Sequence, residues 1–373
     1  MNIEIKQDIL LENLNYVIRG ISTKNIIPIL NCIKFELTNE GLYMTSTDNE
    51  SAIKTFIPVD KIEKVNNLGE IVISGKYIYD IVRKLPNTII KIEEVIDNKI
   101  NISTPNSSFD LNCNNVNEFP ELDLNDSKNP VSITRTAFKK LVKQTTFAAS
   151  TQENRPEFTG INFKIDNQLL ECTSTDSYRL AKKEINIMEE LEDSVNIIVP
   201  TKNLNELEKM LSDNDREIQI HIFNNKIIFK FDNIIVMSRL INGTYPDTNR
   251  LIPTEFKLIL TVNWSDFYQA IDRASLLTSE FDKNTIKLDY SNGIVNISSN
   301  IPEIGHVEEK LNVECNNNES IKLAFSSKYM LDALKALECE KINIKFNGEE
   351  KPIIITDSEN NDVIQLILPV KTY

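Results

Sequence analysis

Few side chains in this chain are of the types that do chemistry, and they are scattered. Asp48, Asp176 and Asp247 each follow Thr or Pro in a polar segment and could be ligands for Mg²⁺ or Mn²⁺ in a phosphoesterase. Such a site needs two or more carboxylates in one cleft. Asp48 and Asp176, however, each end the tetrapeptide TSTD, which occurs at 45–48 and again at 173–176. If this recurrence marks equivalent places in repeated domains, the carboxylates are kept apart, and we expect no metal site.

Residues for other kinds of catalysis are also scarce. Of the two histidines, His221 alternates with apolar residues and His306 lies in a polar stretch, so structural roles are expected for both. There is no Walker A, GxSxG, HExxH or GxGxxG motif. The five cysteines are widely spaced without a CxxC pair, which predicts buried, reduced thiols: Cys32, Cys113, Cys172, Cys315 and Cys339. We therefore expect no enzymatic activity and no cofactor.

The composition is that of an acidic globular protein. A net charge of −14 over 373 residues disfavours a DNA-binding domain that grips phosphates tightly, so any contact with DNA has to be local and weak. Hydrophobic residues make up 41%, without a run near the roughly 20 apolar residues of a membrane span. Residues 1–16 mix charged and apolar side chains, unlike a secretory signal. We expect a cytosolic protein of two or three domains that does not enter membranes.

Two series of amphipathic segments recur at a nearly constant interval. The first series comprises segments 7–20, 135–149 and 263–277, whose starts are equally spaced and match the spacing of the two TSTD tetrapeptides. Its apolar residues are three and four positions apart, as in Phe267, Ile271 and Ala274. The second series comprises segments 74–86, 199–212 and 325–337, at close to the same spacing. Each of these has Ser or Thr ahead of a Lys-containing run, so we expect six helices, with N-caps from the hydroxyl side chains in the second series.

Short segments of alternating hydrophobicity lie between the expected helices. They include IKFELT, GLYMTST, INFKID, QLLECTST, EIQIHIF, KIIFKFD, GIVNISS and INIKFN, bounded by Asn, Asp and Gly. These patterns predict antiparallel strands. The fold class is therefore α+β, with three tandem similar domains at 1–125, 126–253 and 254–373, each with two helices packed on antiparallel sheets.

The expected helices are basic although the chain is acidic. Across 7–24, 75–86, 135–149, 200–212, 263–277 and 326–337 there are 14 Lys or Arg and 8 Asp or Glu, against 41 and 55 in the whole chain. A surface lined by these helices would attract a phosphate backbone mildly. The alternative is that the lysines are only solvated helix residues.

Six sequence blocks resemble the bacterial DNA polymerase III beta subunit, the beta sliding clamp, in that family's order. The blocks are TKNIIPIL at 23–30, STQENRPEFTGINF at 150–163, STDSYRLA at 174–181, LINGTYPDTNRLIP at 240–253, SSKYMLDALKAL at 326–337 and LILPVKTY at 366–373. The resemblance covers nearly the whole chain. It implies the DNA clamp fold and a head-to-tail homodimer whose six domains form a closed ring. It also implies a non-catalytic processivity factor that encircles double-stranded DNA in the cytoplasm, at the nucleoid.

The resemblance implies two protein-binding surfaces. The dimer interface would join domain 1 of one chain to domain 3 of the other, with Phe109, Leu111, Leu276 and Leu277 as its apolar core. Internal core is the alternative for these four residues. A pocket between domains 2 and 3 would bind linear motifs of the DNA polymerase III alpha subunit, the clamp loader, other polymerases and repair proteins.

The pocket residues follow from the blocks that resemble the family's. They are Arg155, Phe158, Thr175, Ser177, Tyr178, Arg179, Leu180, Pro246, Arg250, Leu251, Ser326, Tyr329, Pro352, Leu366, Ile367, Leu368 and Val370. Leu180 and Leu366 would serve equally as core. Ser177 stands where Gly is frequent in the family, and Leu368 and Val370 where Met is frequent, so the peptide preference is left open.

The resemblance also suggests which residues face DNA. Lys24 and Gln152 match family positions beside the duplex, and the inner helices add further candidates: Lys139, Lys140, Lys143 and Arg273. Their contacts would be to phosphate or through water, without base readout. A repeat scaffold that binds proteins but never encircles DNA remains the alternative, since it would share the pocket and differ in ring closure and in the basic interior.

Overall fold

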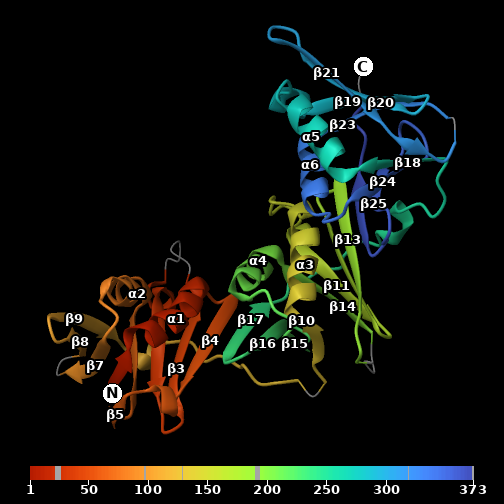
Figure 1. Ribbon diagram of the computed structural model, residues 1–373. Helices are drawn as coiled ribbons and strands as arrows, with labels where there is room; N and C mark the ends of the chain where they lie inside the picture. Colours follow the sequence, from red (N-terminus) through yellow and green to blue (C-terminus); the bar gives the residue numbers. More distant parts are fainter. Residues whose placement is uncertain (22–26, 96–97, 128, 190–193, 318, 372–373) are drawn as a thin grey trace. The chain divides into compact units, whose positions relative to one another are not determined.

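The computed structural model describes residues 1–373 except 22–26, 96–97, 128, 190–193, 318 and 372–373. The chain forms two compact units (Figure 1). The first comprises Met1–Arg135 and Glu206–Leu240, and the second comprises Thr136–Asn205 and Ile241–Tyr373. The middle sequence repeat thus contributes to both units.

The first unit is built on one sheet of 13 strands in the order β10-β15-β16-β17-β4-β3-β2-β6-β9-β8-β7-β1-β5. Its strands are β1 Asn2–Lys6, β2 Cys32–Leu37, β3 Gly41–Thr47, β4 Ser51–Pro58, β5 Lys64–Asn67, β6 Gly69–Ser74, β7 Ile89–Val95, β8 Lys99–Thr104, β9 Ser107–Asn114, β10 Val131–Thr134, β15 Glu217–Ile222, β16 Lys226–Phe231 and β17 Ile234–Arg239. Helices α1 (Gln7–Val17) and α2 (Gly75–Lys84) lie side by side on this sheet (Figure 1). The phenol of Tyr79 on α2 donates to Asn15 Oδ1 on α1 at 3.0 Å.

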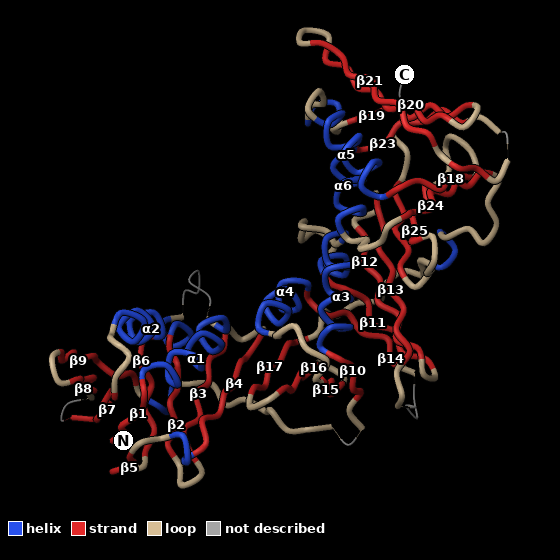
Figure 2. The backbone as a smooth tube through the Cα atoms, in the orientation of Figure 1, coloured by secondary structure: helices blue, strands red, loops and turns tan. Residues whose placement is uncertain are grey.

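The second unit has two sheets. Nine strands follow the order β14-β11-β12-β13-β26-β25-β24-β18-β22, and four follow the order β21-β20-β19-β23. They are β11 Gly160–Asp166, β12 Leu169–Thr175, β13 Arg179–Asn186, β14 Val195–Pro200, β18 Leu258–Asn263, β19 Thr285–Ser291, β20 Ile294–Ile301, β21 Gly305–Asn312, β22 Glu314–Cys315, β23 Ile321–Ser326, β24 Lys341–Phe346, β25 Ile353–Asp357 and β26 Val363–Ile367. Helices α5 (Trp264–Ser275) and α6 (Ser327–Lys335) pack together (Figure 2).

The six expected helices and the eight expected strand segments are confirmed. The remaining two helices are α3, Arg135–Thr145, and α4, Thr201–Met210. Helix α5 shows why the periodicity succeeded: Phe267, Ala270, Ile271 and Ala274 are buried, three and four residues apart, against the core of the second unit. No helix among the described residues has the length and hydrophobicity needed to cross a membrane.

The expected hydroxyl caps of the second helix series are wrong. Ser74 and Ser326 precede α2 and α6, but neither side chain makes a capping hydrogen bond. Each serine is also the last residue of a strand, so the sheet sets the direction of its side chain. Thr201 is the first residue of α4, and its hydroxyl donates instead to the carbonyl oxygen of Thr159 at 2.6 Å. Among the caps that are seen, Asn263 accepts from the Asp266 N–H at the start of α5.

A buried serine repeats the same contact in all three sequence repeats. In each repeat the hydroxyl donates to a backbone carbonyl at the end of the first helix, where the carbonyl groups lack the full set of helical N–H partners. The bonds join Ser46 to Val17 at 2.6 Å, Ser174 to Thr145 at 2.5 Å and Ser299 to Ala274 at 2.6 Å. Two of these serines belong to the TSTD tetrapeptides, so one function of that repeat is to fasten the first helix to its sheet.

Strand pairing continues across the boundaries between sequence repeats. In the first unit β4 pairs antiparallel with β17, and in the second unit β13 pairs antiparallel with β26. The starts of β4 and β13, Ser51 and Arg179, have the spacing of the two TSTD tetrapeptides, and the starts of β17 and β26, Ile234 and Val363, match it to within one position. The two junctions are therefore equivalent.

The thiols are free, as expected, but they are not all buried. Cys32 and Cys172 are buried and Cys113 and Cys339 are half-buried. For Cys315 the expectation of burial is wrong. It lies on β22, the outermost strand of the nine-stranded sheet, and is exposed.

Arg135 is a charged residue with only 2% of its surface exposed. Its guanidinium lies 2.8 Å from Asp232 Oδ1, bonds the Ser212 hydroxyl at 3.3 Å and stands over the Phe231 ring. Asp232 also meets Arg216 at 3.2 Å. These hydrogen bonds and charges hold the pKa of Asp232 below its usual value.

Candidate partner-binding pocket and assembly surfaces

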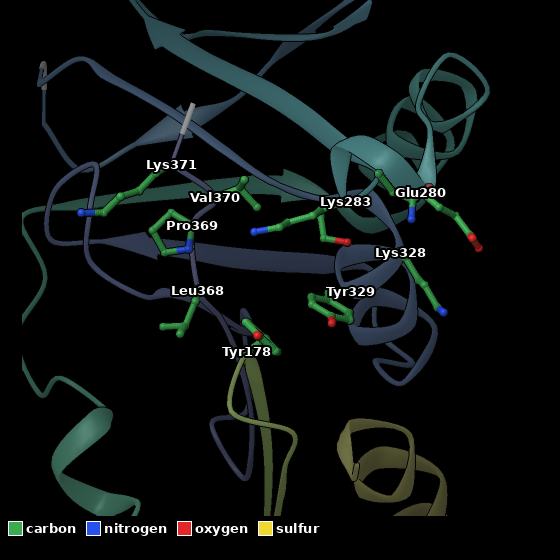
Figure 3. A pocket seen from close by; sticks show the side chains of 11 residues that line it. Tyr178, Glu280, Lys283, Lys328, Tyr329, Leu368, Pro369, Val370 and Lys371 are labelled. Atoms are coloured by element: carbon green, nitrogen blue, oxygen red, sulfur yellow. The ribbon is translucent and has the colours of Figure 1, made fainter. Parts of the chain in front are cut away.

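A cavity of about 690 Å³ lies in the second unit beside the C-terminal segment (Figure 3). It is bordered by the turn before β13, the loop after the short helix Glu280–Asp282, the start of α6 and the segment after β26. The lining residues are Tyr178, Glu280, Lys283, Asn284, Ser326, Lys328, Tyr329, Leu368, Pro369, Val370 and Lys371. Apolar side chains at its centre and charged ones around it suit an extended peptide.

Two tyrosines form one wall of the cavity. Tyr178 is 60% exposed and stacks on Tyr329 with ring centroids 6.5 Å apart. The C-terminal segment is held on both sides, because the Leu368 N–H donates to the Tyr178 carbonyl at 2.9 Å and the Val370 N–H donates to the Ala324 carbonyl at 2.7 Å. The apolar surface therefore belongs to an ordered backbone.

The turn before β13 presents Tyr178 to the cavity. Ser177 has a φ of 77°, a left-handed conformation that favours glycine. Asp176 Oδ1 accepts from the N–H groups of Tyr178 and Arg179, and the Thr175 hydroxyl donates to the Arg179 carbonyl at 2.5 Å. These bonds hold the turn although residue 177 has a side chain.

Arg179 is enclosed between two carboxylates and two rings. Its guanidinium is 3.1 Å from Asp176 Oδ2 and 2.7 Å from Asp332 Oδ2 on α6. The same group stands 4.6 Å from the centroid of the Tyr329 ring and 5.4 Å from that of Phe147. Arg179 thus joins the turn that carries Tyr178 to the helix that carries Tyr329.

The strands β9 and β21 each have an open edge among the described residues. β21 pairs only with β20, and residues 107–112 of β9 pair only with β8. Phe109 on β9 is 38% exposed, and Leu276 directly after α5 is 77% exposed. Leu111 and Leu277 are half-buried. Open strand edges with apolar neighbours are typical sites of strand pairing between chains.

Three family models of the DNA polymerase III beta subunit match consecutive parts of the chain. The N-terminal domain matches residues 1–123, the central domain 132–247 and the C-terminal domain 249–371. The beta sliding clamps of Staphylococcus epidermidis and Staphylococcus aureus are 37% and 36% identical, with each chain covered completely. This chain belongs to the beta sliding clamp family.

Solved structures agree with this membership. The DNA polymerase sliding clamp of Bacillus subtilis superposes with a TM-score of 0.96 at 38% identity, and a DNA polymerase III beta subunit of Pseudomonas aeruginosa with 0.93 at 25%, each covering both chains completely. The chain therefore has three tandem clamp domains, and the family is non-catalytic.

The clamp's pocket contains five of the residues that the sequence blocks suggested: Tyr178, Ser326, Tyr329, Leu368 and Val370. Sequence reasoning missed six lining residues. Lys328, Pro369 and Lys371 lie inside the quoted blocks and could have been found as neighbours of the chosen residues. The other three, Glu280, Lys283 and Asn284, come from the short helix Glu280–Asp282 and the loop after it, which no motif or periodicity singles out.

A second group of suggested residues lies at, or follows in sequence, an aromatic pair elsewhere in the same unit of the clamp. The Phe158 and Tyr245 rings meet edge to face at 5.9 Å, and the Arg155 guanidinium stands 4.0 Å from the Phe158 centroid. The exposed residues Pro246, Arg250 and Leu251 follow Tyr245 in the chain. They do not line the cavity beside the C-terminal segment.

Several suggested residues have structural surroundings in this clamp. Leu180 and Leu366 are 2% and 3% exposed and pack with Ile354, and Ile367 is 1% exposed in the core of the second unit. Their side chains support the pocket's strands from the interior. Thr175, Ser177 and Arg179 shape the turn described above, and Pro352 is half-buried at the start of β25.

The suggested DNA-facing residues lie on the helices and an adjoining loop. Lys140 and Lys143 are exposed on α3 and Lys139 is half-buried beside them. Gln152 is exposed. Arg273 on α5 forms two bonds of 2.8 Å with the Glu309 carboxylate. Lys24 lies outside the described residues.

The three aspartates of the phosphoesterase alternative each serve a local turn. Their carboxylates accept backbone N–H groups two or three residues further on, from Ser51 to Asp48, from Arg179 to Asp176 and from Asn249 to Asp247. The described residues contain no group of three or more His, Cys, Asp or Glu that could hold a metal. The metal-dependent alternative has no support in a clamp.

Proposed function

We propose that two copies of this clamp close head to tail around double-stranded DNA and tether replication and repair proteins through the pocket beside the C-terminal segment. The observation that carries the ring is the pair of open strand edges, β9 and β21. β9 begins at Ser107, about one repeat interval before β17, and β21 begins at Gly305, about one repeat interval after β13. β9 is thus the first-repeat counterpart of β17 and β26, and β21 is the third-repeat counterpart of β4 and β13.

The proposed interface repeats the internal junctions between chains. β9 of one copy would pair with β21 of the next as β17 pairs with β4 and β26 with β13. Such a contact is heterologous and forms a ring when its rotation closes. Phe109 and Leu111 of one copy and Leu276 and Leu277 of the other would bury their exposed surface there.

The proposed DNA contact is electrostatic and independent of sequence. Lys139, Lys140 and Lys143 on α3 would face the phosphates, with Gln152, Lys24 and Arg273 as further candidates. The Glu309 carboxylate already neutralises Arg273, so we assign that residue the smallest contribution. Encirclement lets a chain of net charge −14 stay on DNA without tight binding.

The proposed partners are the DNA polymerase III alpha subunit, the clamp loader, other polymerases and repair proteins, in the cytoplasm at the nucleoid. Each would present a short motif whose apolar side chain enters the pocket beside Tyr178, Tyr329, Leu368 and Val370. The domain division 1–125, 126–253 and 254–373 forms part of the same proposal.

Retention on DNA tests the ring. After loading onto nicked circular plasmid, the clamp should stay bound during gel filtration and be lost once the plasmid is cut with a restriction enzyme. Equal retention on circular and linear plasmid, or a monomer at about 1 µM in sedimentation, would rule out the ring. The remaining function would then be that of a scaffold that binds proteins without encircling DNA. Binding of a labelled QLxLF-type peptide tests the pocket separately.

A further inference from the structure

The partner pocket is rimmed by cations although the chain is acidic. Three of its eleven lining residues are lysines, Lys283, Lys328 and Lys371, against one carboxylate, Glu280. Lys283 and Lys328 form no ion pair among the described residues. Lys371 forms one ion pair, with Glu350 at 3.8 Å, in which both side chains are about four-fifths exposed. The rim therefore holds positive charge that the folded chain does not neutralise.

The backbone holds these lysines at the cavity without help from neighbouring charges. Lys283 has a φ of 52°, and the loop after it is tied to α6 because the Ser327 N–H donates to the Asn284 carbonyl at 2.8 Å. Lys328 lies in the first turn of α6, which has no acidic residue. A cation is unfavourable at a helix N-terminus, so helix stability does not account for Lys328.

Lysines lie at both ends of an apolar surface and beside its middle. Figure 3 shows Lys283 extending toward Pro369 and Val370, while Lys328 lies on the α6 side and Lys371 at the C-terminal end. Tyr178, Tyr329, Leu368 and Val370 supply the surface for an aliphatic or aromatic anchor. An anchor with negative charges on either side of it would meet complementary surface at both ends.

We infer that this pocket selects partner segments in which an apolar anchor is flanked by Asp or Glu. The inference rests on the proposed peptide-binding function and specifies its ligand. Over the rest of a surface with net charge −14 an acidic segment is repelled, so the cationic rim provides discrimination as well as attraction. Both effects are screened by salt.

Three fluorescein-labelled peptides test this inference. They share one apolar anchor and differ only in four flanking residues, which are all Glu, all Gln or all Lys. Fluorescence polarisation at about 50 mM and about 500 mM NaCl gives each Kd. We expect the Glu peptide to bind roughly fivefold tighter than the Gln peptide at low salt, the Lys peptide to bind weakest, and the differences to shrink at high salt.

The double variant Lys283→Gln/Lys328→Gln should remove most of the preference for Glu, measured as the ratio of the Gln-peptide Kd to the Glu-peptide Kd. Lys322→Gln is the matched control, since it removes one charge from an exposed lysine of the same unit outside the pocket. Equal affinity for the Glu and Gln peptides, or a preference that survives in the double variant, overturns the inference and leaves the peptide pocket standing. Failure of all three peptides to bind overturns the proposed pocket itself.

Discussion

At the scale of single residues, the pocket depends on a side chain that does not line it. Arg179 spans Asp176 and Asp332 and packs beside Tyr329, so it fixes the distance between the two tyrosines. A planar guanidinium can bond two carboxylates in this way, whereas a lysine ammonium offers no such fork. We therefore describe Arg179 as a positioning residue.

Asp332→Asn should weaken binding of a pocket peptide roughly fivefold, because the charge-assisted bond that holds Arg179 to α6 is lost. Arg179→Lys should have a similar effect. Peptide polarisation measures both, and hydrogen exchange of the 175–179 turn should rise in parallel, which a direct ligand contact would not cause. Asp272→Asn, an exposed carboxylate on α5, is the control. Unchanged affinity in both variants would remove the positioning role.

The pocket's membership shows how far sequence reasoning reaches at this scale. Tyr178, Tyr329 and Leu368 were found because each lies in a block of recognisable order. Lys283 was missed because its place depends on a loop with a left-handed residue and on a hydrogen bond to α6, neither of which has a sequence pattern. Leu180 and Leu366 show the opposite difficulty, since the same apolar residue fits a pocket or a core.

Thiol reactivity follows from burial. Burial raises the pKa of Cys113 and of Cys339 to about 11, and burial also raises the pKa of Cys172 well above its usual value. At about pH 8, close to the ordinary thiol pKa, only about one in a thousand of the Cys113 and Cys339 groups is thiolate. Ellman's reagent should therefore modify one thiol of the native protein quickly, and Cys315→Ser should abolish that phase. Two or more fast equivalents would contradict this assignment.

At the scale of elements, periodicity identified helices and strands but not their partners. The stripe of Phe267, Ile271 and Ala274 predicts one buried face wherever the helix packs. Alternation likewise predicts strands such as β3 and β16. The pairing of β4 with β17 joins Ile53 to Val236 across most of the first unit's sequence, and no local pattern encodes such a register. The constant repeat interval supplied the domains, and only the structure supplied the continuous sheets.

The ion pair between the buried Arg135 and Asp232 makes the stability of the first unit sensitive to acid. The pKa of Asp232 is lower in the folded chain than in the unfolded chain, mainly because of its hydrogen bond to Arg135. The stability from this pair is therefore complete above the unfolded pKa of about 4 and is lost as the pH falls through the lower folded value.

Asp232→Asn should lower the free energy of unfolding by about 2 kcal/mol at neutral pH, less than for a fully buried pair because Asp232 is 45% exposed. The difference from the parent protein should shrink below about pH 4. Urea denaturation at several pH values measures both. Asp289→Asn is the control: it breaks the exposed ion pair with Lys322 and should change the free energy of unfolding only slightly. If the loss of unfolding free energy in Asp232→Asn stays the same at acidic pH, the ion pair with Arg135 is not its cause.

At the scale of the whole molecule, the predicted ring depends on an interface that the single chain leaves open. Phe109→Asp or Leu276→Asp should place a charge in the proposed contact and give a monomer in sedimentation at about 1 µM. Retention on nicked circular plasmid should disappear, while the peptide Kd should not change. Met188→Asp is the control, because Met188 is 91% exposed but lies on neither open edge. A dimer that persists in both interface variants would require another contact surface.

The equivalence of the strand junctions has a further consequence for how such a ring opens. The internal junctions β4·β17 and β13·β26 each join strands of one polypeptide, so a broken junction faces its partner at an effective concentration in the millimolar range and closes again at once. The proposed junction between chains has the same type of pairing without a covalent tether. Its lifetime is set by dissociation alone, so the lack of a covalent connection is enough to make the proposed junction the place where we expect such a ring to open.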